Sequence, residues 1–317
     1  MEEKLLVSFW PHIQDRVSTK RIMWTVFLSL IPSGIAGVYL FGLHALLLIF
    51  VSIFTAVITE AIIQFLRKKE ITIIDGSAAL TGLLVAYNLS PTVPFWIPIV
   101  GSFFAIAIAK QAFGGLGRNI FNPALSARVF LLLSWPTYMT SFIKPFSGLD
   151  TVSSATPLVL YKEANLNLSN MGLSYLDLFL GKRAGCIGEV AILWLLLGAG
   201  ILLFLKIISL HIPLSFLLSF STLSWIFPKS GFFKGDVLFS LMSGGLILGA
   251  FFMATDYVTS PLTKKGKIIF GVGCGLLTFL IRRFSGYPEG VSFSILIMNA
   301  FVPLIDRYLK PRVYGKK

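Results

Sequence analysis

Residues 45–66 read ALLLIFVSIFTAVITEAIIQFL, a stretch in which Glu60 is the single charged residue. A helix needs roughly 20 predominantly apolar residues to cross a bilayer, so this stretch is long enough to span one. The rest of the chain has the same character, since 56% of its 317 residues are hydrophobic, 13% are charged and the mean hydropathy is +0.83. A water-exposed globular surface needs more charge than this. We therefore predict an all-α integral membrane protein.

Apolar stretches follow one another on both sides of this segment and predict about ten transmembrane helices. The first five are expected at 22–41, 45–66, 77–89, 95–112 and 120–135, and the second five at 189–207, 212–227, 237–254, 268–282 and 291–305. A polar stretch separates the two groups. The chain then divides into an N-terminal segment (1–21), a first five-helix unit (22–136), a central loop (137–188), a second five-helix unit (189–306) and a C-terminal segment (307–317).

Charge and cysteine content argue against two classes of site. The net charge of +13 comes from short basic clusters between apolar stretches and not from one basic stripe, so we predict no binding of nucleic acid. Cys186 and Cys274 are too few and too far apart for a zinc or iron–sulfur site, and no metal site is predicted. Both are expected to be unpaired small residues in or beside helices. Residues 1–20 carry several charges and show no removable signal peptide.

Basic residues accumulate in cytoplasmic loops, so their distribution predicts orientation. One side collects Lys4, Arg16, Lys20, Arg21, Arg67, Lys68, Lys69, Arg118, Lys264, Lys265, Lys267, Arg307, Lys310, Arg312, Lys316 and Lys317. The opposite side has fewer, chiefly Lys144, Lys162, Lys182, Arg183, Lys229 and Lys234. Both termini are therefore expected in the cytoplasm and the central loop outside. Arg282 and Arg283 fall on the outer side and are the one cluster that argues against this orientation.

Five spans per unit is an odd number, so two units of one fold must be inverted relative to each other. A faint repeat supports this: a span opened by Asp75 and closed by Ser90-Pro91, and a span opened by Asp236 and closed by Ser260-Pro261, are both interrupted by small and polar residues. Such broken spans often mark a central site between repeats. Small residues also simply allow helices to pack closely in lipid, and the pattern favours neither explanation.

Four short motifs stand out in the loops and at the ends of the spans. They are 114–124 (GGLGRNIFNPA), 150–158 (DTVSSATPL), 254–261 (ATDYVTSP), and 286–290 (GYPEG) leading to 298–300 (MNA). Taken alone, the hydroxyl residues of 150–158 are ordinary loop or helix-capping residues. The glycine-rich run at 114–117 follows no strand of a βαβ unit, so we interpret it as a tight turn that delivers Asn119, Asn122 and Pro123 to the start of a helix.

Together the four motifs resemble the D subunit of the Rnf ion-translocating ferredoxin:NAD oxidoreductase complex, which is similar to the B subunit of the sodium-translocating NADH:quinone reductase. The resemblance covers nearly the whole chain and implies a fold similar to that of urea transporters. It also implies other complex subunits as partners, a location in the cell (inner) membrane, and an FMN that a flavin transferase attaches through its phosphate to a threonine. A second, non-covalent flavin such as riboflavin is compatible with the family.

The resemblance assigns the attachment site to Thr156. Asp150, Ser153, Ala155 and Thr156 match the family pattern Asp-x-x-(Ser/Thr)-Gly-Ala-Thr, and Ser154 stands where glycine is usual. Pro157 biases the preceding residue toward an extended backbone, which suits presentation of Thr156 to a modifying enzyme. The basic residues independently place this motif outside.

Charged residues at membrane depth usually face a cavity, a partner or an ion path. Arg128 and Glu60 are the best candidates for buried roles, while the position of Asp256 in or near a span leaves its role open. By contrast, we expect Asp75, Glu189 and Asp236 to be solvated helix caps and Lys182 and Arg183 to be solvated surface charges.

Three functions remain. The first is a subunit that carries electrons on FMN at Thr156 within a complex that couples ferredoxin and NAD redox chemistry to sodium or proton movement. It would have no autonomous active site. The second is a passive solute channel or transporter, which the same fold would suit, but a channel has no need of the motif at 150–157. The third is a scaffold that only holds partner subunits.

Overall fold

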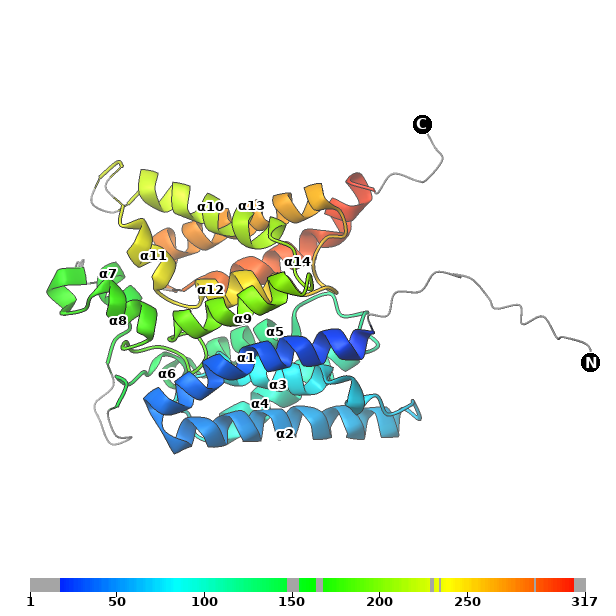
Figure 1. Cartoon of the computed structure of the whole chain (residues 1–317). Helices are drawn as coiled ribbons and strands as arrows, with labels where there is room; N and C mark the ends of the chain where they lie inside the picture. Colours follow the sequence, from blue (N-terminus) through cyan, green and yellow to red (C-terminus); the bar gives the residue numbers. More distant parts are fainter. Residues whose placement is uncertain are drawn as a thin grey trace, which may run out of the picture.

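The computed structural model describes residues 18–146, 154–163, 168–228, 231–233, 235–287 and 289–310, and regular structure in them is helical apart from one isolated β-bridge (Figure 1). The first group of helices comprises α1 (Thr19–Phe41), α2 (Leu43–Leu66), η1 (Ile73–Asp75), α3 (Ser77–Tyr87), α4 (Trp96–Phe104) with its π-helical continuation η2 (Ala105–Gln111), and α5 (Pro123–Ser134). Four short elements follow: α6 (Pro136–Thr140), α7 (Pro157–Glu163), η3 (Leu168–Met171) and α8 (Tyr175–Leu180). The second group comprises α9 (Ile192–Phe204), α10 (His211–Ile226), α11 (Val237–Met242), α12 (Leu246–Leu248), the π-helix η4 (Gly249–Met253), α13 (Lys264–Phe284) and α14 (Val291–Tyr308).

The helices have the length and surface of a membrane protein. Within the described chain, α1, α2 and α14 are long and apolar enough to cross a bilayer, and several shorter apolar helices accompany them. One face of helix α2 exposes large apolar side chains at helical spacing, as expected for a helix that faces lipid and not water. These residues are Leu47, Phe50, Phe54, Ile58, Ile62 and Phe65. The prediction of a helical membrane protein is confirmed in this form.

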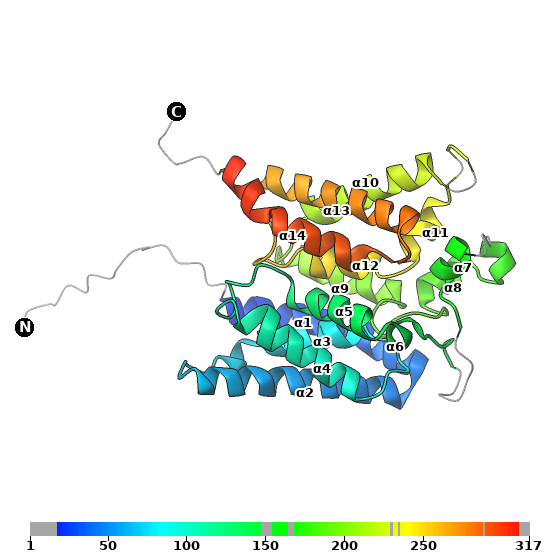
Figure 2. The ribbon, with the colours of Figure 1, turned by 180° about the vertical axis from the view of Figure 1, so that it is seen from behind.

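The two groups pack side by side, with α1 against α9 where they meet (Figures 1 and 2). Within the first group α2 packs on α3 and α4, and within the second α10 packs on α13. The α10–α13 contact is close because it is made by small residues. A β carbon on Gly271 would lie 1.9 Å from Ser215 Oγ, and one on Gly275 would lie 1.9 Å from Ser219 Oγ. Small residues at four-residue spacing are the usual way for helices to associate in lipid.

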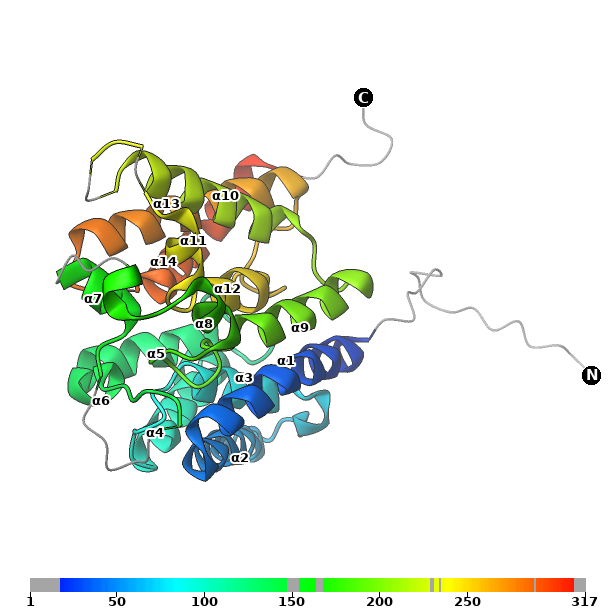
Figure 3. The same ribbon diagram turned by 60° about the vertical axis from the view of Figure 1, so that its left-hand side comes forward.

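The ends of the elements separate into two sides. Helix α1 begins and α14 ends at the same end of the bundle, whereas α6, α7 and α8 gather at the opposite end (Figures 1 and 3). Helix α8 contacts α9 and α11 there, so this short helix joins the end of the second group. The first and last described helices therefore have their outer ends on one side of the bundle, and the short helices between α5 and α9 lie on the other (Figures 1 and 3).

The third expected span is a short helix and the eighth is interrupted, and both contain the small and polar residues noted in the sequence. Helix α3 ends at Tyr87, well short of Ser90-Pro91. The eighth span bends at residues 243–245 between α11 and α12, where Gly244 has a φ of +71° that favours glycine.

The central segment differs from the predicted outer loop. Its last part, residues 183–190, is buried against the end of α3. The backbone N–H groups of Ile187 and Gly188 donate to the carbonyls of Leu89 (3.0 Å) and Tyr87 (3.1 Å). Because α3 stops early, these carbonyls lack helical partners, and irregular backbone at this depth is tolerated when it satisfies such groups inside the protein. The sixth helix accordingly starts at Ile192 and not at Glu189.

Candidate functional site

Thr156 lies at the start of α7, on the side opposite to the ends of the described chain. Its carbonyl accepts a hydrogen bond from Leu160 N at 3.1 Å, and its hydroxyl accepts a long one from Val159 N at 3.4 Å. The residue is half-buried, and the preceding Ala155 is exposed. Thr156 therefore caps a helix turn, as an ordinary threonine would. Asp150 and Ser153 lie outside the described residues.

The segment around Thr156 is held at two points. Before it, Ser154 N donates to Phe142 O at 2.7 Å, forming the isolated antiparallel bridge. After it, Lys162 Nζ donates to Ser285 O and to Tyr287 O, the latter at 2.9 Å. Helix α7 is thereby fixed to the turn between α13 and α14.

Thr156 opens into a cavity lined by residues that are far apart in the sequence. Charged residues from three elements reach it: Arg128 from α5, Arg183 and Glu189 from the buried segment before α9, and Glu289 from the turn before α14. The aromatic rings of Tyr287 and Phe293 line the same cavity, with their centroids 5.1 Å apart.

Arg128 has the buried role that the sequence predicted. It is 8% exposed and forms an ion pair with Glu289, linking the first group of helices to the second. Its Nη1 also donates to Asn88 O at 3.0 Å and Asn88 Oδ1 at 2.7 Å. These contacts satisfy the guanidinium at the point where α3 ends.

The expectation for Glu189 and Arg183 was wrong, because they are 4% and 3% exposed and are neither solvated caps nor surface charges. Arg183 Nη2 donates to Glu189 O at 3.1 Å and to Gly244 O at 3.3 Å. Two buried atoms, Arg183 Nε and Glu189 Oε2, have no hydrogen-bond partner among the described residues. Asp236, by contrast, caps α11 as predicted, accepting from Phe239 N at 2.9 Å, and Lys182 is exposed.

A sequence signal could have indicated this burial. The two charged residues flank the run Ala-Gly-Cys-Ile-Gly at 184–188, which is too small and apolar for a solvated loop. Cys186 within it is free and buried, as is Cys274 in α13, in agreement with prediction.

The two acidic residues at the cavity have opposite pKa shifts. Burial and the neighbouring Glu289 raise the pKa of Glu189 to about 7. Burial also opposes ionisation of Glu289, but Arg128, the hydrogen bond from Gly245 N and the charge of Arg282 outweigh it and lower the pKa of Glu289. One carboxyl group therefore favours its neutral form and the other its anion.

Arg282, the residue that argued against the predicted orientation, is bound inside the protein. Its guanidinium donates to Glu289 O at 3.0 Å, Ser240 O at 2.8 Å and Ser243 O at 3.1 Å, and it lies 4.8 Å from the centre of the Phe220 ring. Because Arg282 is buried and bonds to backbone carbonyls, it does not indicate which side of the membrane it faces.

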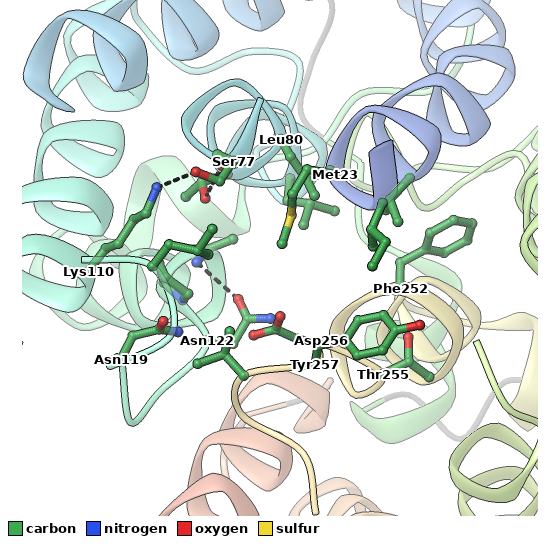
Figure 4. A pocket seen from close by; sticks show the side chains of 18 of the residues that line it. Met23, Ser77, Leu80, Lys110, Asn119, Asn122, Phe252, Thr255, Asp256 and Tyr257 are labelled. Atoms are coloured by element: carbon green, nitrogen blue, oxygen red, sulfur yellow. Dashed lines mark hydrogen bonds between the residues drawn. The ribbon is translucent and has the colours of Figure 1, made fainter. Parts of the chain in front are cut away.

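A second cavity lies toward the end where α1 begins (Figure 4). Asn119, Asn122 and Asp256 face it, and so do the rings of Phe252 and Tyr257. The glycine-rich turn precedes these asparagines, with Gly114, Gly115 and Gly117 all at positive φ. Asn122 caps α5, accepting from Ala124 N at 3.1 Å, and its Nδ2 donates across to Met253 O at 3.2 Å. The predicted turn and cap are confirmed, and Asn119 Oδ1 is buried without a hydrogen-bond partner in the described chain.

Lys110 lies at the edge of this cavity and pairs with Glu60, the other residue predicted to be buried. Lys110 Nζ lies 2.8 Å from Glu60 Oε2 and 2.7 Å from Ser77 Oγ (Figure 4 draws the second contact). Gln111 Nε2 donates to Glu60 Oε1 at 2.8 Å. Both charged residues are 1% exposed.

Comparison with known proteins gives consistent results. A model of the NQR2, RnfD, RnfE family matches residues 6–315. The chain is 49% identical over 317 residues to the D subunit of the Na(+)-translocating ferredoxin:NAD(+) oxidoreductase complex of Acetobacterium woodii, covering 99% of this chain and 96% of that protein. It is 47% identical over 318 residues to the D subunit of the proton-translocating ferredoxin:NAD(+) oxidoreductase complex of Clostridium ljungdahlii, with 98% and 96% covered. It is 42% identical over 334 residues to the D subunit of an ion-translocating oxidoreductase complex of Stutzerimonas stutzeri, with 95% and 93% covered.

Proposed function

Since the chain belongs to the NQR2, RnfD, RnfE family, we infer that it is the D subunit of a membrane-bound, ion-translocating ferredoxin:NAD oxidoreductase complex, and we propose that it carries electrons on an FMN bound covalently at Thr156. The observation that supports the FMN proposal is the position of Thr156, a half-buried residue that lines a cavity together with buried charged residues. The other redox sites belong to partner subunits.

The residues around Thr156 fit a phosphoester-linked flavin. The Thr156 hydroxyl is the bonding atom, and Arg183 offers an Nε–H that has no acceptor among the described residues. Arg128, Arg183 and Arg282 outnumber Glu189 and Glu289, so the site favours a group that carries negative charge. A bound flavin would supply electron transfer at this position, and the protein would tune its potential through nearby charge and hydrogen bonds.

The second cavity is our candidate for a non-covalent flavin such as riboflavin. Its lining combines apolar surface from Phe251 and Phe252 with the amides of Asn119 and Asn122. A flat apolar cofactor with polar edges needs this combination, and the unpartnered Asn119 Oδ1 is an acceptor available for it.

We further propose that the two helix groups are inverted five-helix repeats in a fold like that of urea transporters, with both termini in the cytoplasm and Thr156 on the outer face. The support is that α1 starts at the end of the bundle where α9 finishes, so the first helices of the two groups run in opposite directions (Figure 1). The broken spans, α3 and α11 to η4, occupy the third place in each group.

The runner-up function, a passive channel, finds less support at the centre of the molecule. Arg128 reaches from the first group to Glu289 in the second and also bonds to Asn88, so a buried ion pair connects the two groups. The coupling ion is open, since relatives of nearly equal identity are named as sodium-translocating and as proton-translocating.

The test is tandem mass spectrometry of protein made together with a flavin transferase, combined with in-gel fluorescence of the denatured chain. We expect FMN on Thr156 in the wild type, none in Thr156→Ala or Thr156→Val, and partial attachment in Thr156→Ser, which keeps the hydroxyl. Thr140→Ala is the matched control, because Thr140 lines the same cavity and should leave the modification unchanged. Flavin that persists in Thr156→Ala would overturn the assignment.

A further inference from the structure

Two carboxyl groups from distant parts of the chain meet beside the Thr156 cavity. Glu189 precedes α9 and Glu289 precedes α14, and both face Gly245 in the bend of the broken eighth span. A β carbon on Gly245 would lie 2.5 Å from Glu289 Oε1 and 2.7 Å from Glu189 Oε2. The two carboxyl groups are therefore neighbours, and Glu289 is among the groups that raise the pKa of Glu189. Only a glycine leaves room for both at this point.

The donors available to these oxygens are unequal. Glu289 Oε1 accepts from Gly245 N at 2.7 Å, and Glu289 Oε2 accepts from Arg128. Glu189 Oε1 accepts from Cys186 N at 3.1 Å, but Glu189 Oε2 has no donor among the described residues although it is buried. Two ionised carboxylates are both acceptors and cannot bond to each other. A proton between them resolves the conflict, and the atom that lacks a donor is the one that should carry it.

We propose that Glu189 and Glu289 form a binding site for one exchangeable proton, held on Glu189 Oε2 and donated to Glu289, in the cavity that Thr156 lines. The site itself needs only these side chains. A role of this proton site in electron transfer rests on the proposed flavin at Thr156.

The charges that face the pair determine how tightly it holds the proton. Arg128 from α5, Arg282 from α13 and Arg183 from the segment before α9 stabilise the anionic form, while burial and the second carboxylate oppose it. Cys186 faces the pair from the same segment. The balance places the pKa of Glu189 at about 7, so the site exchanges its proton near neutral pH.

The proton has a route to the solvent. The cavity volume is about 70 Å³, which exceeds the roughly 10–15 Å³ that one water needs. The Glu289 side chain is 20% exposed, whereas Glu189 is 4% exposed. Water in the cavity can therefore reach the pair, and residues of α6 and α7, which lie at the end of the bundle opposite to the start of α1 (Figure 3), line the same cavity.

Binding and release change only charge. On binding, one O–H bond of a hydronium ion in the cavity water breaks, leaving a water molecule, and one O–H bond forms on a carboxylate oxygen, so the net charge of the Glu189–Glu289 pair rises by one. If a flavin is bound at Thr156, an electron that the complex supplies to it would add negative charge to the same cavity and would raise the affinity of the pair for its proton. By linkage, the bound proton makes the flavin easier to reduce.

The first experiment uses Thr156→Ala protein, which cannot carry the flavin, and measures the infrared carbonyl band of a protonated carboxylic acid between pH 5 and 9. We expect a band that disappears near pH 7 and is lost in the Thr156→Ala, Glu189→Gln double variant. The Glu189→Gln change should preserve the fold, because the introduced amide N–H can donate to Glu289 as the protonated acid does. Glu70→Gln, at an exposed position, is the control and should leave the band unchanged. A band that survives Glu189→Gln, or no titrating band at all, would overturn the proton site.

The second experiment measures the flavin potential against pH in protein with Thr156 intact. The potential should fall with rising pH through neutrality, and Glu189→Gln should flatten this dependence. An unchanged slope would overturn the link to the flavin. Wild-type protein without any flavin would instead overturn the proposed function, and the infrared result would still decide the proton site.

Discussion

Two buried charge clusters lie toward opposite sides of the bundle, and they are built differently. In the Glu60–Lys110 cluster every charged atom has partners, because Ser77, Gln64 and Gln111 complete the ion pair. In the cluster at the Thr156 cavity, Arg128 and Glu289 are paired, but Arg183 Nε and Glu189 Oε2 are buried without hydrogen-bond partners in the described chain. Burying charge is costly in both places.

The difference separates a fixed arrangement from one that can change. A complete set of partners holds the Glu60–Lys110 pair in one arrangement, and the pair joins η2 to α2. The incomplete set at the cavity leaves capacity for a proton or a ligand. Unsatisfied buried atoms are rare in native proteins, and each calls for an explanation of this kind.

The largest expected effect is on the fixed pair. Lys110→Met leaves Glu60 as a buried charge with only amide donors, which should lower the free energy of unfolding by about 3–5 kcal/mol. The double variant Glu60→Gln, Lys110→Met removes both charges and should recover much of this loss. Chemical unfolding in detergent micelles measures both. Equal losses in the single and double variants would contradict the description of a coupled pair.

The next largest effect on stability concerns the space beside Gly245, which the carboxyl groups of Glu189 and Glu289 share. Gly245→Ala places a β carbon within 2.7 Å of oxygens of both Glu189 and Glu289, and we expect a loss of about 1–3 kcal/mol in unfolding free energy. Gly200→Ala in α9 is the control, since nothing lies within 4 Å of its added carbon. That control should be neutral or slightly stabilising. A neutral Gly245→Ala would show that the pair is not crowded.

Ser77→Ala should have a smaller effect than Lys110→Met. It removes one acceptor from Lys110 Nζ but leaves Glu60 in place, so we expect a loss of about 1–2 kcal/mol. Thr25→Ala, whose exposed hydroxyl bonds only within its own helix, should cost less. Comparing the two by thermal unfolding measures how much each partner contributes to the fixed pair.

The smallest expected effect at any one pH, but the most diagnostic, is a change in how steeply the stability of the fold depends on pH. The pKa of Glu189 is raised from 4.5 to about 7 in the folded protein, so the folded state binds the proton more tightly than the unfolded state. The resulting stabilisation is present below pH 4.5 and is lost as the pH rises through about 7. Wild-type protein should therefore lose stability between pH 5 and 8 more steeply than Glu189→Gln. Parallel melting-temperature profiles would argue against the raised pKa.

The sequence predicted one cluster better than the other for a physical reason. Glu60 and Arg128 stand inside apolar stretches, where a charge must find a partner, so their burial followed from the hydropathy pattern alone. Glu189 and Arg183 stand at the border of the polar segment and flank the short apolar run 184–188, which packs against the end of α3. The run indicates burial, but its packing partner depends on contacts between distant segments, which a local pattern does not record.

In the fold, too, features that depend on local sequence were predicted and features that depend on distant contacts were not. The positions of the apolar helices and the breaks in the third and eighth spans were predicted from length and small residues, because both are local properties. The short helices α6 to α8 were not predicted, since their stability depends on packing against the ends of the bundle and not on their own length.

The attachment of α7 determines where a group on Thr156 can be. The bridge from Ser154 to Phe142 holds the segment before Thr156, and Lys162 holds α7 to the turn that also presents Glu289. A flavin esterified there would sit on a short, doubly anchored support and not on a swinging arm. Electron tunnelling slows steeply as the gap between two redox centres widens, so such a support would fix the gap to partner centres once the complex has assembled. Rates through this subunit would then be altered mainly by moving a whole neighbouring subunit toward or away from it.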